Sequence, residues 1–567
     1  MKKNHLRYQI TLVFVLLNFL ILNAQTVKNF NIDLTRKLNT ISPLFWGTNF
    51  LFWIDDKASL QDGLIETSLK NMPCTILRYP GGTVAENFHW KTTMLDNAFI
   101  FPFQQGASQT NFDEFIAFCR RVNAEPLLVV NTQSWWIHND VAGGVKEAVD
   151  WVQYCKDKNY NVKYWEIGNE TYWQQFMTAT EYGQLVKKYA RAMKAVDPTI
   201  KISANGAYDP NFVGSKERTT VAVWDSIRLK YLNINSYAQS TEFDAYARSY
   251  KTLNITTGTE KWWNNVANAC GDSIDMISVH WYYRKSDISV ITSNLNSIKA
   301  VFNTKFPGRK YTMCLTEYNS KDDSADLAVA NLFDGIGQFL NFGFEIGNFW
   351  PLRFDSGLFA NRSMLSLTAK EESYPYQILK LLSNNLKGEM IYVNSDSSIF
   401  PYVSYDGSQL TVVVCSRSIT TAVNAVMNLQ RLSAFRLVDA KAYDAPLIST
   451  PPIQLVESNV NVVKSNTTCT FQLLPKQTVV LRFNNIVTNT SDVKTADKIV
   501  CNYANGKINF RTDDTVDVTL SNMNGQILCV KKASGLISLD APSKGLYILK
   551  IDSDKNGSQV QKILVNE

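Results

Sequence analysis

Short apolar runs alternate with helix-like amphipathic segments along residues 40–360. Most runs are spaced like βα units of roughly 30–40 residues. Eight such units predict a (β/α)8 barrel, with a doubly wound parallel sheet as the alternative. The longest gap predicts an insertion within residues 208–270, a polar and aromatic stretch. The runs are centred near Leu44, Leu77, Leu128, Glu166, Ser203, Ser278, Cys314 and Asn348.

One segment between two of these runs carries a complete set of helix signals. Thr178 and Glu181 have the spacing of a capping box. Apolar residues then recur at helical spacing as far as Val196, and Asp197-Pro198 predicts the helix end. The next strand-like run begins at Ile200, so we expect this helix to pack on the outside of a barrel wall.

Past residue 380 the pattern changes to short strand-like runs separated by polar turns, which is typical of an all-β sandwich. A polar stretch without a core pattern then suggests a linker. Strand-like runs resume beyond it, and Asn524-Gly525 predicts a tight hairpin turn between two of them. We therefore expect four parts: a TIM barrel over 26–375, a β-sandwich over 376–485, a linker over 486–497 and a small C-terminal β-domain over 498–567.

The first 25 residues have the pattern of an export signal. Positive charges precede an apolar run from Ile10 to Leu22, and Ala24 offers a small residue for cleavage. A membrane helix is the alternative, but a span needs about 20 apolar residues. We therefore predict a cleaved signal peptide over 1–25 and a secreted or cell-surface protein.

The composition of the chain excludes several classes of protein. The chain has 567 residues, with 45% hydrophobic and 19% charged, which excludes disordered and coiled-coil proteins. A net charge of +6 without a clustered basic run argues against nucleic-acid binding. Aromatic residues make up 12%, a weak indication of carbohydrate binding.

The nine cysteines lie mostly in apolar runs, so we interpret them as small buried hydrophobes. Cys119 and Cys155 end two successive helix-like segments and are a candidate disulfide. The chain has four His and no Cys-x-x-Cys pair, so we expect neither a metal nor another cofactor.

Two glutamates follow predicted barrel strands at the end where barrel enzymes carry their sites. The fourth run leads into Asn169-Glu170, and the seventh leads into Glu317. Two carboxylates that face one cleft are what glycoside cleavage requires, one to protonate the leaving oxygen and one to attack or to activate water. Two unrelated surface acids at strand ends are the alternative.

Other strand ends carry supporting candidates. Arg78, before Pro80-Gly81-Gly82, could keep a carboxylate ionised through a charge-assisted pair, or could be a structural arginine beside a turn. His280 could bond the nucleophile or the sugar, or be a satisfied core residue. We add Asn131, which follows the third run, to the substrate-binding candidates.

In order, these residues resemble the motifs of retaining clan A glycoside hydrolases, and within the clan the α-L-arabinofuranosidases of glycoside hydrolase family 51. The resemblance covers about residues 40–485. It rests on Leu77-Arg78-Tyr79-Pro80-Gly81-Gly82 with His89-Trp90, Ile167-Gly168-Asn169-Glu170, the helix 180–200, Asp275–Tyr282, and Thr316-Glu317-Tyr318-Asn319.

The resemblance implies that Glu170 is the acid/base, that Glu317 is the nucleophile, and that the reaction retains configuration. It also implies a substrate-binding set around them: Arg78, Asn169 as donor to the sugar 2-hydroxyl, His280, Tyr282, and Trp350 as a platform under the sugar. We expect anionic Glu317 to raise the pKa of Glu170.

Two segments depart from the family pattern on the sugar-binding side. The region after the first run, Phe45–Trp53, lacks the family's usual Glu. Thr171-Tyr172-Trp173 replaces the usual Asp-Gly-Pro-Trp after the acid/base. An endo-acting clan A glycanase cleaving galactan or a uronic-acid polysaccharide is therefore the second enzyme hypothesis. A non-catalytic barrel that binds glycans through Trp135, Trp136 and Trp173 is the third.

The last 70 residues resemble the type A sorting domains of the type IX secretion pathway. Asn522–Gln526, Gly545–Ile551 and Gln561–Val565 carry this likeness. It implies the secretion machinery as a partner, besides a polysaccharide or oligosaccharide substrate. A small carbohydrate-binding β-module is the alternative.

Overall fold

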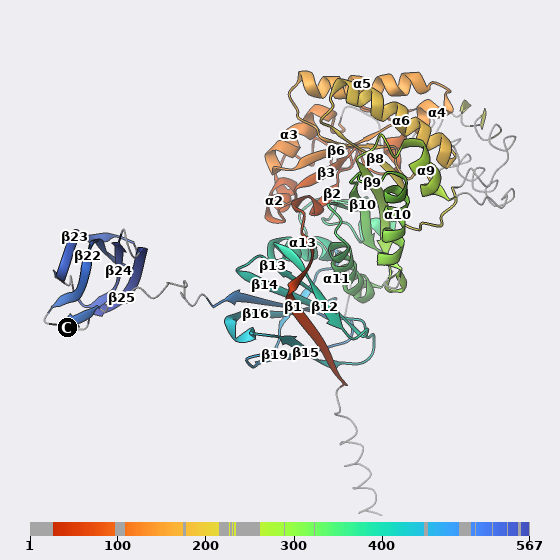
Figure 1. The fold of residues 1–567 in the computed structure, drawn as a ribbon. Helices are drawn as coiled ribbons and strands as arrows, with labels where there is room; N and C mark the ends of the chain where they lie inside the picture. Colours follow the sequence, from red (N-terminus) through yellow and green to blue (C-terminus); the bar gives the residue numbers. More distant parts are fainter. Residues whose placement is uncertain are drawn as a thin grey trace, which may run out of the picture. The chain divides into compact units, whose positions relative to one another are not determined.

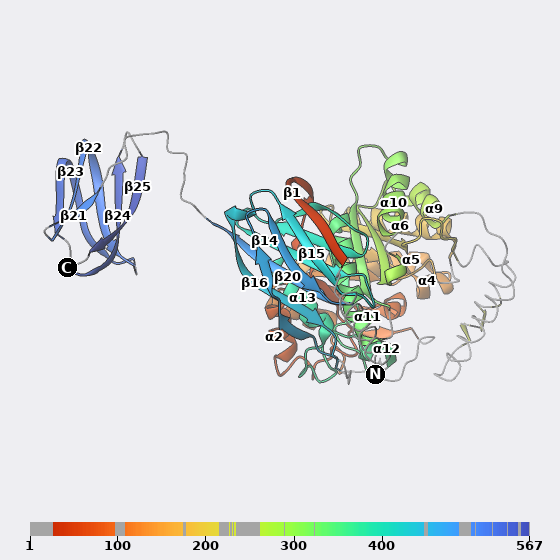
Figure 2. The same cartoon turned by 90° about the horizontal axis from the view of Figure 1, so that it is seen from below.

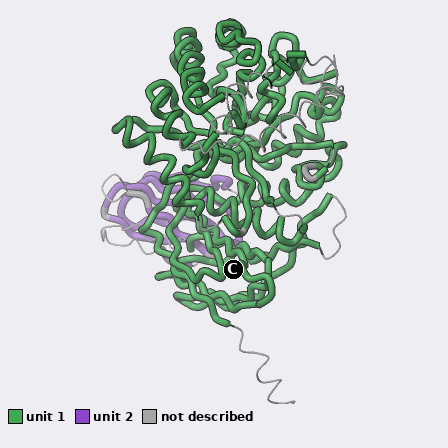
Figure 3. Tube along the Cα trace, turned by 90° about the vertical axis from the view of Figure 1, so that its right-hand side faces the viewer, with its two compact units in different colours: residues 1–486 green, residues 487–567 purple. Residues whose placement is uncertain are grey.

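The computed structural model describes the chain as two compact units, residues 1–486 and 487–567 (Figure 3). The described residues are 26–96, 108–173, 177–214, 226, 229–230, 232–233, 261–287, 290–321, 324–355, 357–446, 452–486, 501–504, 506–523, 525–540, 543–553 and 557–565. The expected signal peptide, most of the expected linker and most of the expected insertion lie outside them.

Eight parallel strands of the first unit form a closed barrel (Figure 1). This closure confirms the predicted TIM barrel and excludes the doubly wound sheet. Seven of the eight predicted run centres lie inside the strands. The strands are β2 (Gly47–Asn49), β3 (Ile76–Tyr79), β6 (Glu125–Val130), β7 (Tyr164–Ile167), β8 (Lys201–Ala207), β9 (Met276–Tyr283), β10 (Thr312–Ser320) and β11 (Ile346–Phe349).

The first strand begins later than the sequence pattern suggested. Leu44, the predicted centre, lies in the short 3-10 helix η1 (Pro43–Phe45). The Ser42 side chain accepts a hydrogen bond from the Leu44 amide, and Pro43 occupies the first turn. This cap favours a turn over an extended strand, so β2 starts only at Gly47.

Helices follow the barrel strands and cover the outside of the barrel. Helix α6 starts after Thr178, whose capping box with Glu181 is formed as predicted. Its apolar face is buried, and it ends at Asp197. The helices among the described residues of this unit are α2 (Leu64–Asn71), α3 (Phe112–Val122), α4 (Gln133–Ile137), α5 (Val141–Asp157), α6 (Ala179–Val196), α9 (Trp262–Cys270), α10 (Ile291–Lys305), α11 (Ala325–Phe342), α12 (Gly357–Ala360) and α13 (Tyr374–Asn385).

Trp262 and Trp263 belong to the barrel and not to the expected insertion. They begin α9, and both side chains are fully buried. Their indole N–H groups donate to the carbonyls of Asn205 and Ala207, at 3.0 and 2.7 Å. Two buried indoles that satisfy the end of β8 fix this helix against the barrel wall.

In the part of the chain that the structure describes, the sandwich has ten strands in one hydrogen-bonded order, β17-β16-β20-β14-β13-β12-β1-β15-β19-β18. Their inner faces enclose one apolar core. The strands are β1 (Thr26–Thr40), β12 (Glu389–Ser395), β13 (Ile399–Tyr405), β14 (Gln409–Ser416), β15 (Val423–Leu429), β16 (Phe435–Asp444), β17 (Val456–Asn459), β18 (Val462–Lys464), β19 (Thr468–Leu473) and β20 (Thr478–Asn485).

The barrel does not start at residue 26, as we expected from the sequence, because strand β1 belongs to the sandwich. This strand lies between β12 and β15 in the sheet order, antiparallel to β12 and parallel to β15, and Figure 2 shows it beside β15. Phe30 and Ile32 enter the sandwich core. The described chain therefore starts in the sandwich, forms the barrel and returns.

The barrel and the sandwich share buried polar contacts. Asp334 on α11 accepts two hydrogen bonds from Arg417, at 2.8 and 3.1 Å, and one from Tyr283 at 2.9 Å. The Tyr402 hydroxyl donates to the carbonyl of Phe333 at 3.1 Å. These contacts tie the sandwich to the helical layer, on the outside of the barrel.

All nine cysteines are free, so the candidate pair of Cys119 and Cys155 is not formed. Both lie in the main apolar core, as the alternative interpretation held. Burial raises the pKa of the Cys155 thiol above its usual value.

Among the described residues, no helix is both long enough and apolar enough to cross a bilayer.

The second unit is a small β-domain with its own apolar core. The predicted hairpin around Gly525 joins β22 to β23, and Gly525 has a φ of +81°. A positive φ of this kind is what a tight hairpin turn needs. The strands are β21 (Asn502–Ala504), β22 (Lys507–Asn522), β23 (Ile527–Asp540), β24 (Gly545–Ser553) and β25 (Gly557–Val565).

Candidate active site

The carboxyl ends of the barrel strands bring the two predicted glutamates together. Glu170 follows β7 in the turn Gly168–Glu170, and Glu317 lies within β10. The pairing of β10 with β9 is irregular between Leu315 and Glu317. A β-bulge or similar irregularity changes the direction in which the side chains of a strand point. Such irregularities are common beside active sites.

Arg78 is the centre of the network beneath these glutamates. Its fully buried guanidinium donates to Glu317 Oε1 at 3.0 Å and to Asn169 Oδ1 at 2.7 Å. It also donates to Glu166 Oε2 at 2.7 Å and to Asn49 Oδ1 at 2.9 Å. One planar cation thus fixes side chains from β2, β7 and β10.

His280 and Tyr282, both on β9, complete the contacts of the glutamates. The Tyr282 hydroxyl donates to Glu317 Oε2 at 2.8 Å. The His280 Nδ1–H donates to Glu170 Oε1 at 3.0 Å and lies 3.4 Å from Glu317 Oε2. The Tyr172 hydroxyl donates to Glu170 Oε1 at 3.3 Å. His280 therefore bridges the two carboxylates.

The two carboxylates are close enough to act on one bond. One oxygen of Glu170, one of Glu317 and a ring nitrogen of His280 all lie within 4.8 Å of one another. Two carboxylates this close can flank a single glycosidic bond, one to protonate the leaving oxygen and one to face the anomeric carbon. Such a cluster could also ligate a metal ion, but the Arg78 cation on Glu317 opposes a second positive charge there.

The pKa shifts in this cluster differ from the sequence-based expectation. Burial raises the pKa of Glu170, but the hydrogen bond and charge of His280, the hydrogen bond of Tyr172 and the charge of Arg78 together lower it. Burial raises the pKa of Glu317, against the charges of His280 and Arg78. Burial opposes the charged form of His280, yet the two carboxylates raise its pKa. His280 contacts both carboxylates, so the protonation of each of the three groups affects the other two.

Gly81 and Gly82 allow the backbone to pass close to the site. Gly81 has a φ of +121°, which side-chain-bearing residues rarely adopt. A Cβ on Gly82 would lie 2.8 Å from the Trp350 ring and 3.0 Å from Glu317 Oε1. The Trp350 indole and the Glu317 carboxylate therefore flank the same backbone.

Asn169 and Asn131 differ in what their amides contact. Among the described residues, the buried Asn169 Nδ2 has no hydrogen-bond partner, whereas its Oδ1 is held by Arg78. This amide can therefore donate to a sugar hydroxyl. Asn131 also lies at the barrel mouth, but its side chain exchanges hydrogen bonds with Ser134 at 2.7 and 3.0 Å. The structure does not bring Asn131 into the glutamate network.

Two buried acids of this region were not singled out from the sequence. Glu166 points into the barrel and accepts from Arg78 and, at 3.1 Å, from Thr316. A charged residue inside an apolar strand was a visible signal for it. Glu86, in the short 3-10 helix η2 (Thr83–Asn87), has 0% exposure and accepts hydrogen bonds from the loops after β6 and β7. No periodicity marks that position.

The loop after β2 is apolar at the place where the family that the sequence resembles usually carries a glutamate. Leu51, Ile54 and Trp53 pack with Trp350 and Tyr282. The first acid along this loop is Asp55, which is fully buried. It accepts a hydrogen bond from Arg353 at 2.8 Å. An aromatic and aliphatic wall therefore borders the glutamate site on this side.

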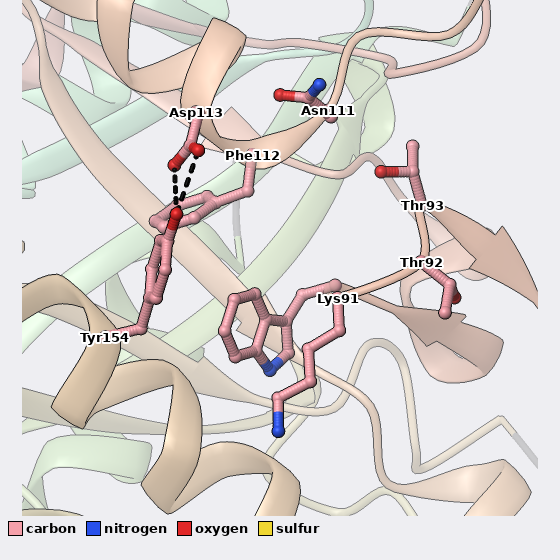
Figure 4. A pocket seen from close by; sticks show the side chains of 8 residues that line it. Lys91, Thr92, Thr93, Asn111, Phe112, Asp113 and Tyr154 are labelled. Atoms are coloured by element: carbon pink, nitrogen blue, oxygen red, sulfur yellow. Dashed lines mark hydrogen bonds between the residues drawn. The ribbon is translucent and has the colours of Figure 1, made fainter. Parts of the chain in front are cut away.

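A separate surface hollow of about 520 Å³ lies between residues 90–93, the start of α3 and α5 (Figure 4). The charged side chains that line it are already engaged: the Tyr154 hydroxyl donates to both Asp113 oxygens, and Lys91 donates to Asp150. The Trp90 ring is stacked on Trp151. None of its lining residues belongs to the glutamate network, so this hollow is not the reaction site.

Comparison with known families identifies two matching regions. Residues 68–255 match the family described as the alpha-L-arabinofuranosidase 1 domain. Residues 499–566 match the secretion system C-terminal sorting domain. Both resemblances inferred from the sequence are therefore confirmed.

Curated relatives and a solved structure agree with the first match. A probable α-L-arabinofuranosidase C of Aspergillus clavatus is 27% identical over 210 residues, 32% of this chain and 38% of that protein. An intracellular exo-α-(1→5)-L-arabinofuranosidase of Acetivibrio thermocellus is 29% identical over 206 residues, 31% and 37%. The aligned part thus spans well under half the length of these relatives.

The fold agreement extends further than the sequence agreement. The α-L-arabinofuranosidase of Thermotoga maritima, solved with arabinose, superposes with a TM-score of 0.61 at 18% identity. The superposition covers 81% of this chain and all of that one. This likeness confirms the barrel and sandwich architecture.

Proposed function

We propose that this protein is a secreted retaining glycoside hydrolase of the α-L-arabinofuranosidase type. The observation that carries the proposal is the convergence of Glu170 and Glu317 within 4.8 Å of one another at the barrel mouth. Their surroundings differ, with Glu317 bound by Arg78 and Tyr282 and Glu170 bound by His280 and Tyr172. Two carboxylates in unlike environments suit two unlike roles.

In the first step, Glu317 attacks the anomeric carbon and the glycosidic C–O bond breaks. Glu170 gives its proton to the departing oxygen, which leaves as an alcohol. Arg78 and Tyr282 aim Glu317 and counter the burial that raises its pKa, and Asn169 Nδ2 donates to the 2-hydroxyl of the sugar.

In the second step, water releases the sugar from Glu317. Glu170, now a carboxylate, takes a proton from this water, whose oxygen bonds to the anomeric carbon as the ester bond to Glu317 breaks. Two inversions at the same carbon give net retention of configuration.

His280 supplies the proton that the first step needs. The directions of the two shifts, down for the pKa of Glu170 and up for the pKa of His280, favour His280 over Glu170 as the holder of this proton before the substrate binds. Transfer along the 3.0 Å hydrogen bond moves that proton to Glu170 and leaves His280 neutral. The number of protons in the cluster does not change, so the transfer needs no exchange with solvent.

The sugar class rests on the arabinofuranosidase match over residues 68–255. A panel of nitrophenyl glycosides and of plant and algal polysaccharides tests it. Free arabinose supports the proposal, whereas oligosaccharide products would favour the endo-acting glycanase. The apolar loop after β2 is the feature that favours this second candidate. Glycan binding without any product would favour the non-catalytic barrel.

Azide chemistry tests the two roles separately. Glu317→Gly with added azide should yield a glycosyl azide of inverted configuration, because azide replaces the missing nucleophile in a single displacement. Glu170→Ala with azide should yield the azide with retained configuration. Full wild-type turnover by Glu317→Gly without azide would refute the assignment of the nucleophile.

Export across the outer membrane is the proposed role of the C-terminal unit. The match of residues 499–566 to a sorting domain supports it. Removal of 487–567 should leave the enzyme inside the producing cell, where cell fractionation detects it. Unchanged surface or medium activity would contradict this role.

A further inference from the structure

We propose that Glu86 is the positioning residue that sets the turn carrying Glu170, so that the acid/base depends on a buried carboxylate which never touches the sugar. The inference rests on the proposed role of Glu170. Glu86 lies in η2 (Thr83–Asn87), behind the turn Gly168–Glu170, and its side chain has 0% exposure.

Four donors converge on the two oxygens of Glu86. Oε1 accepts from the Asn169 backbone N–H at 2.6 Å and from the Thr171 hydroxyl at 3.1 Å. Oε2 accepts from the Gln133 backbone N–H at 3.0 Å and from the Thr132 hydroxyl at 2.6 Å. A backbone N–H can only donate, so each oxygen of residue 86 has to accept. A carboxylate meets this requirement and a neutral amide does not.

The turn that Glu86 holds is conformationally unfavourable by itself. Gly168 has a φ of +74°, and Glu170 has a φ of +45° although it carries a side chain. A Cβ on Gly168 would come within 2.8 Å of Glu86 Oε1. Non-glycine residues persist in the left-handed region only where surrounding contacts impose it. The bond from Asn169 N–H to Glu86 lies between these two residues and fixes both.

Glu86 also differs from the other buried acids of the first unit. Asp55, Glu166 and Asp334 each accept from an arginine. Among the described contacts of Glu86, the partners are backbone amides and hydroxyls only. Burial raises its pKa, and those four donors oppose the rise. Burial of this carboxylate is energetically unfavourable. We therefore infer that its role is to accept the hydrogen bonds of the two loops that donate to it.

Leaving-group dependence is the measurement that separates positioning from simple destabilisation. Glu86→Gln keeps the shape of the side chain and loses one of the two acceptors. Aryl arabinofuranosides with poor leaving groups need the acid, whereas a dinitrophenyl group leaves without one. We expect kcat/KM to fall about 10–100-fold for methoxyphenyl substrates and no more than about threefold for the dinitrophenyl substrate. Glu170→Ala gives the reference pattern.

Asp334→Asn is the matched control, because Asp334 is another buried acid that lies outside the glutamate network. It should lower thermal stability without changing the leaving-group dependence. If Glu86→Gln yields no folded protein, Thr132→Val removes one hydroxyl donor and should show the same pattern with a smaller amplitude. An equal loss on all leaving groups, an unchanged enzyme, or the same pattern in Asp334→Asn would overturn the inference.

Amide hydrogen exchange keeps this test separate from the proposed function. The Asn169 amide should exchange faster in Glu86→Gln than in wild type or Asp334→Asn, whether or not a substrate is turned over. If wild type cleaves no arylglycoside, the proposed function fails, and the exchange result alone decides whether Glu86 holds the turn. Equal exchange in all three proteins would refute the role of Glu86 even in an active enzyme.

Discussion

Replacement of Arg78 by lysine should damage stability and turnover together. The guanidinium makes four hydrogen bonds of 2.7–3.0 Å to Glu166, Asn49, Glu317 and Asn169. A lysine ammonium is a single point and cannot reach Glu166 and Glu317 in the same geometry. One buried carboxylate is then left without its cation.

The size of the effect follows from that loss. Removing one partner of a buried ion pair costs about 3–5 kcal/mol, and hydrogen bonds to charged groups contribute about 1.5–3 kcal/mol each. We therefore expect Arg78→Lys to lower the free energy of unfolding by about 3–5 kcal/mol. An unanchored Glu317 should reduce kcat/KM by about 10²–10³-fold.

Urea unfolding and steady-state kinetics measure the two effects in parallel. Arg417→Lys is the control, since Arg417 holds Asp334 between barrel and sandwich and is remote from the glutamates in the network of contacts. It should lose stability and keep kcat/KM within a few-fold. If Arg78→Lys proves as stable and as active as wild type, the idea that one guanidinium organises the site is wrong.

Three further changes test separate parts of the account. Tyr282→Phe removes a donor that lowers the pKa of Glu317, so the acidic limb of the pH–rate profile should move to higher pH by up to about one unit; Tyr283→Phe, whose hydroxyl serves Asp334 instead, should leave the limb in place. Gly82→Ala should lower kcat/KM about 10–100-fold because its Cβ would approach Glu317 to 3.0 Å, and a wild-type rate would contradict that geometry. Removal of 487–567 should leave kcat/KM and the unfolding of the remaining unit unchanged in urea, since the unit ending at residue 486 has its own cores, and a large loss of either would show that the two units depend on each other.

Barrel strands could be predicted from the sequence because each is a short apolar run followed by an amphipathic helix. The exception, the first strand, was misplaced where Ser42-Pro43 caps a turn beside an apolar stretch. Strand β1 was missed for a different reason. Most of its side chains are exposed, and its partners β12 and β15 lie more than 300 residues further along the chain.

The residues of the site that lie at the ends of barrel strands could be predicted from the sequence. Parallel strands end at one mouth, so Glu170 and Glu317 could be brought together from their positions alone. Asn131 meets the same criterion, yet its amide is held by Ser134. Glu86 does not lie at a strand end but in η2, further along the segment after β3, and two of its donors are backbone amides of distant loops. Contacts of this kind leave no mark in the sequence.

The direction of the pKa shift of Glu170 could not be predicted from the sequence either. The expectation that Glu317 raises the pKa of Glu170 considered the two carboxylates alone. The charge of His280 lowers the pKa of both glutamates, but the pKa of Glu170 is lowered further by the hydrogen bond from His280 at 3.0 Å. The direction of the shift at Glu170 therefore depends on a third buried group.

The most direct test of double displacement is the mass of the enzyme during turnover of a slow substrate. A dinitrophenyl 2-fluoro-arabinofuranoside should form a stable ester, and peptide mass spectrometry should find the added sugar on the peptide that contains Glu317. The label should be absent from Glu317→Gly. A label on any other residue, or turnover of this substrate with inverted configuration and no adduct, would contradict the account.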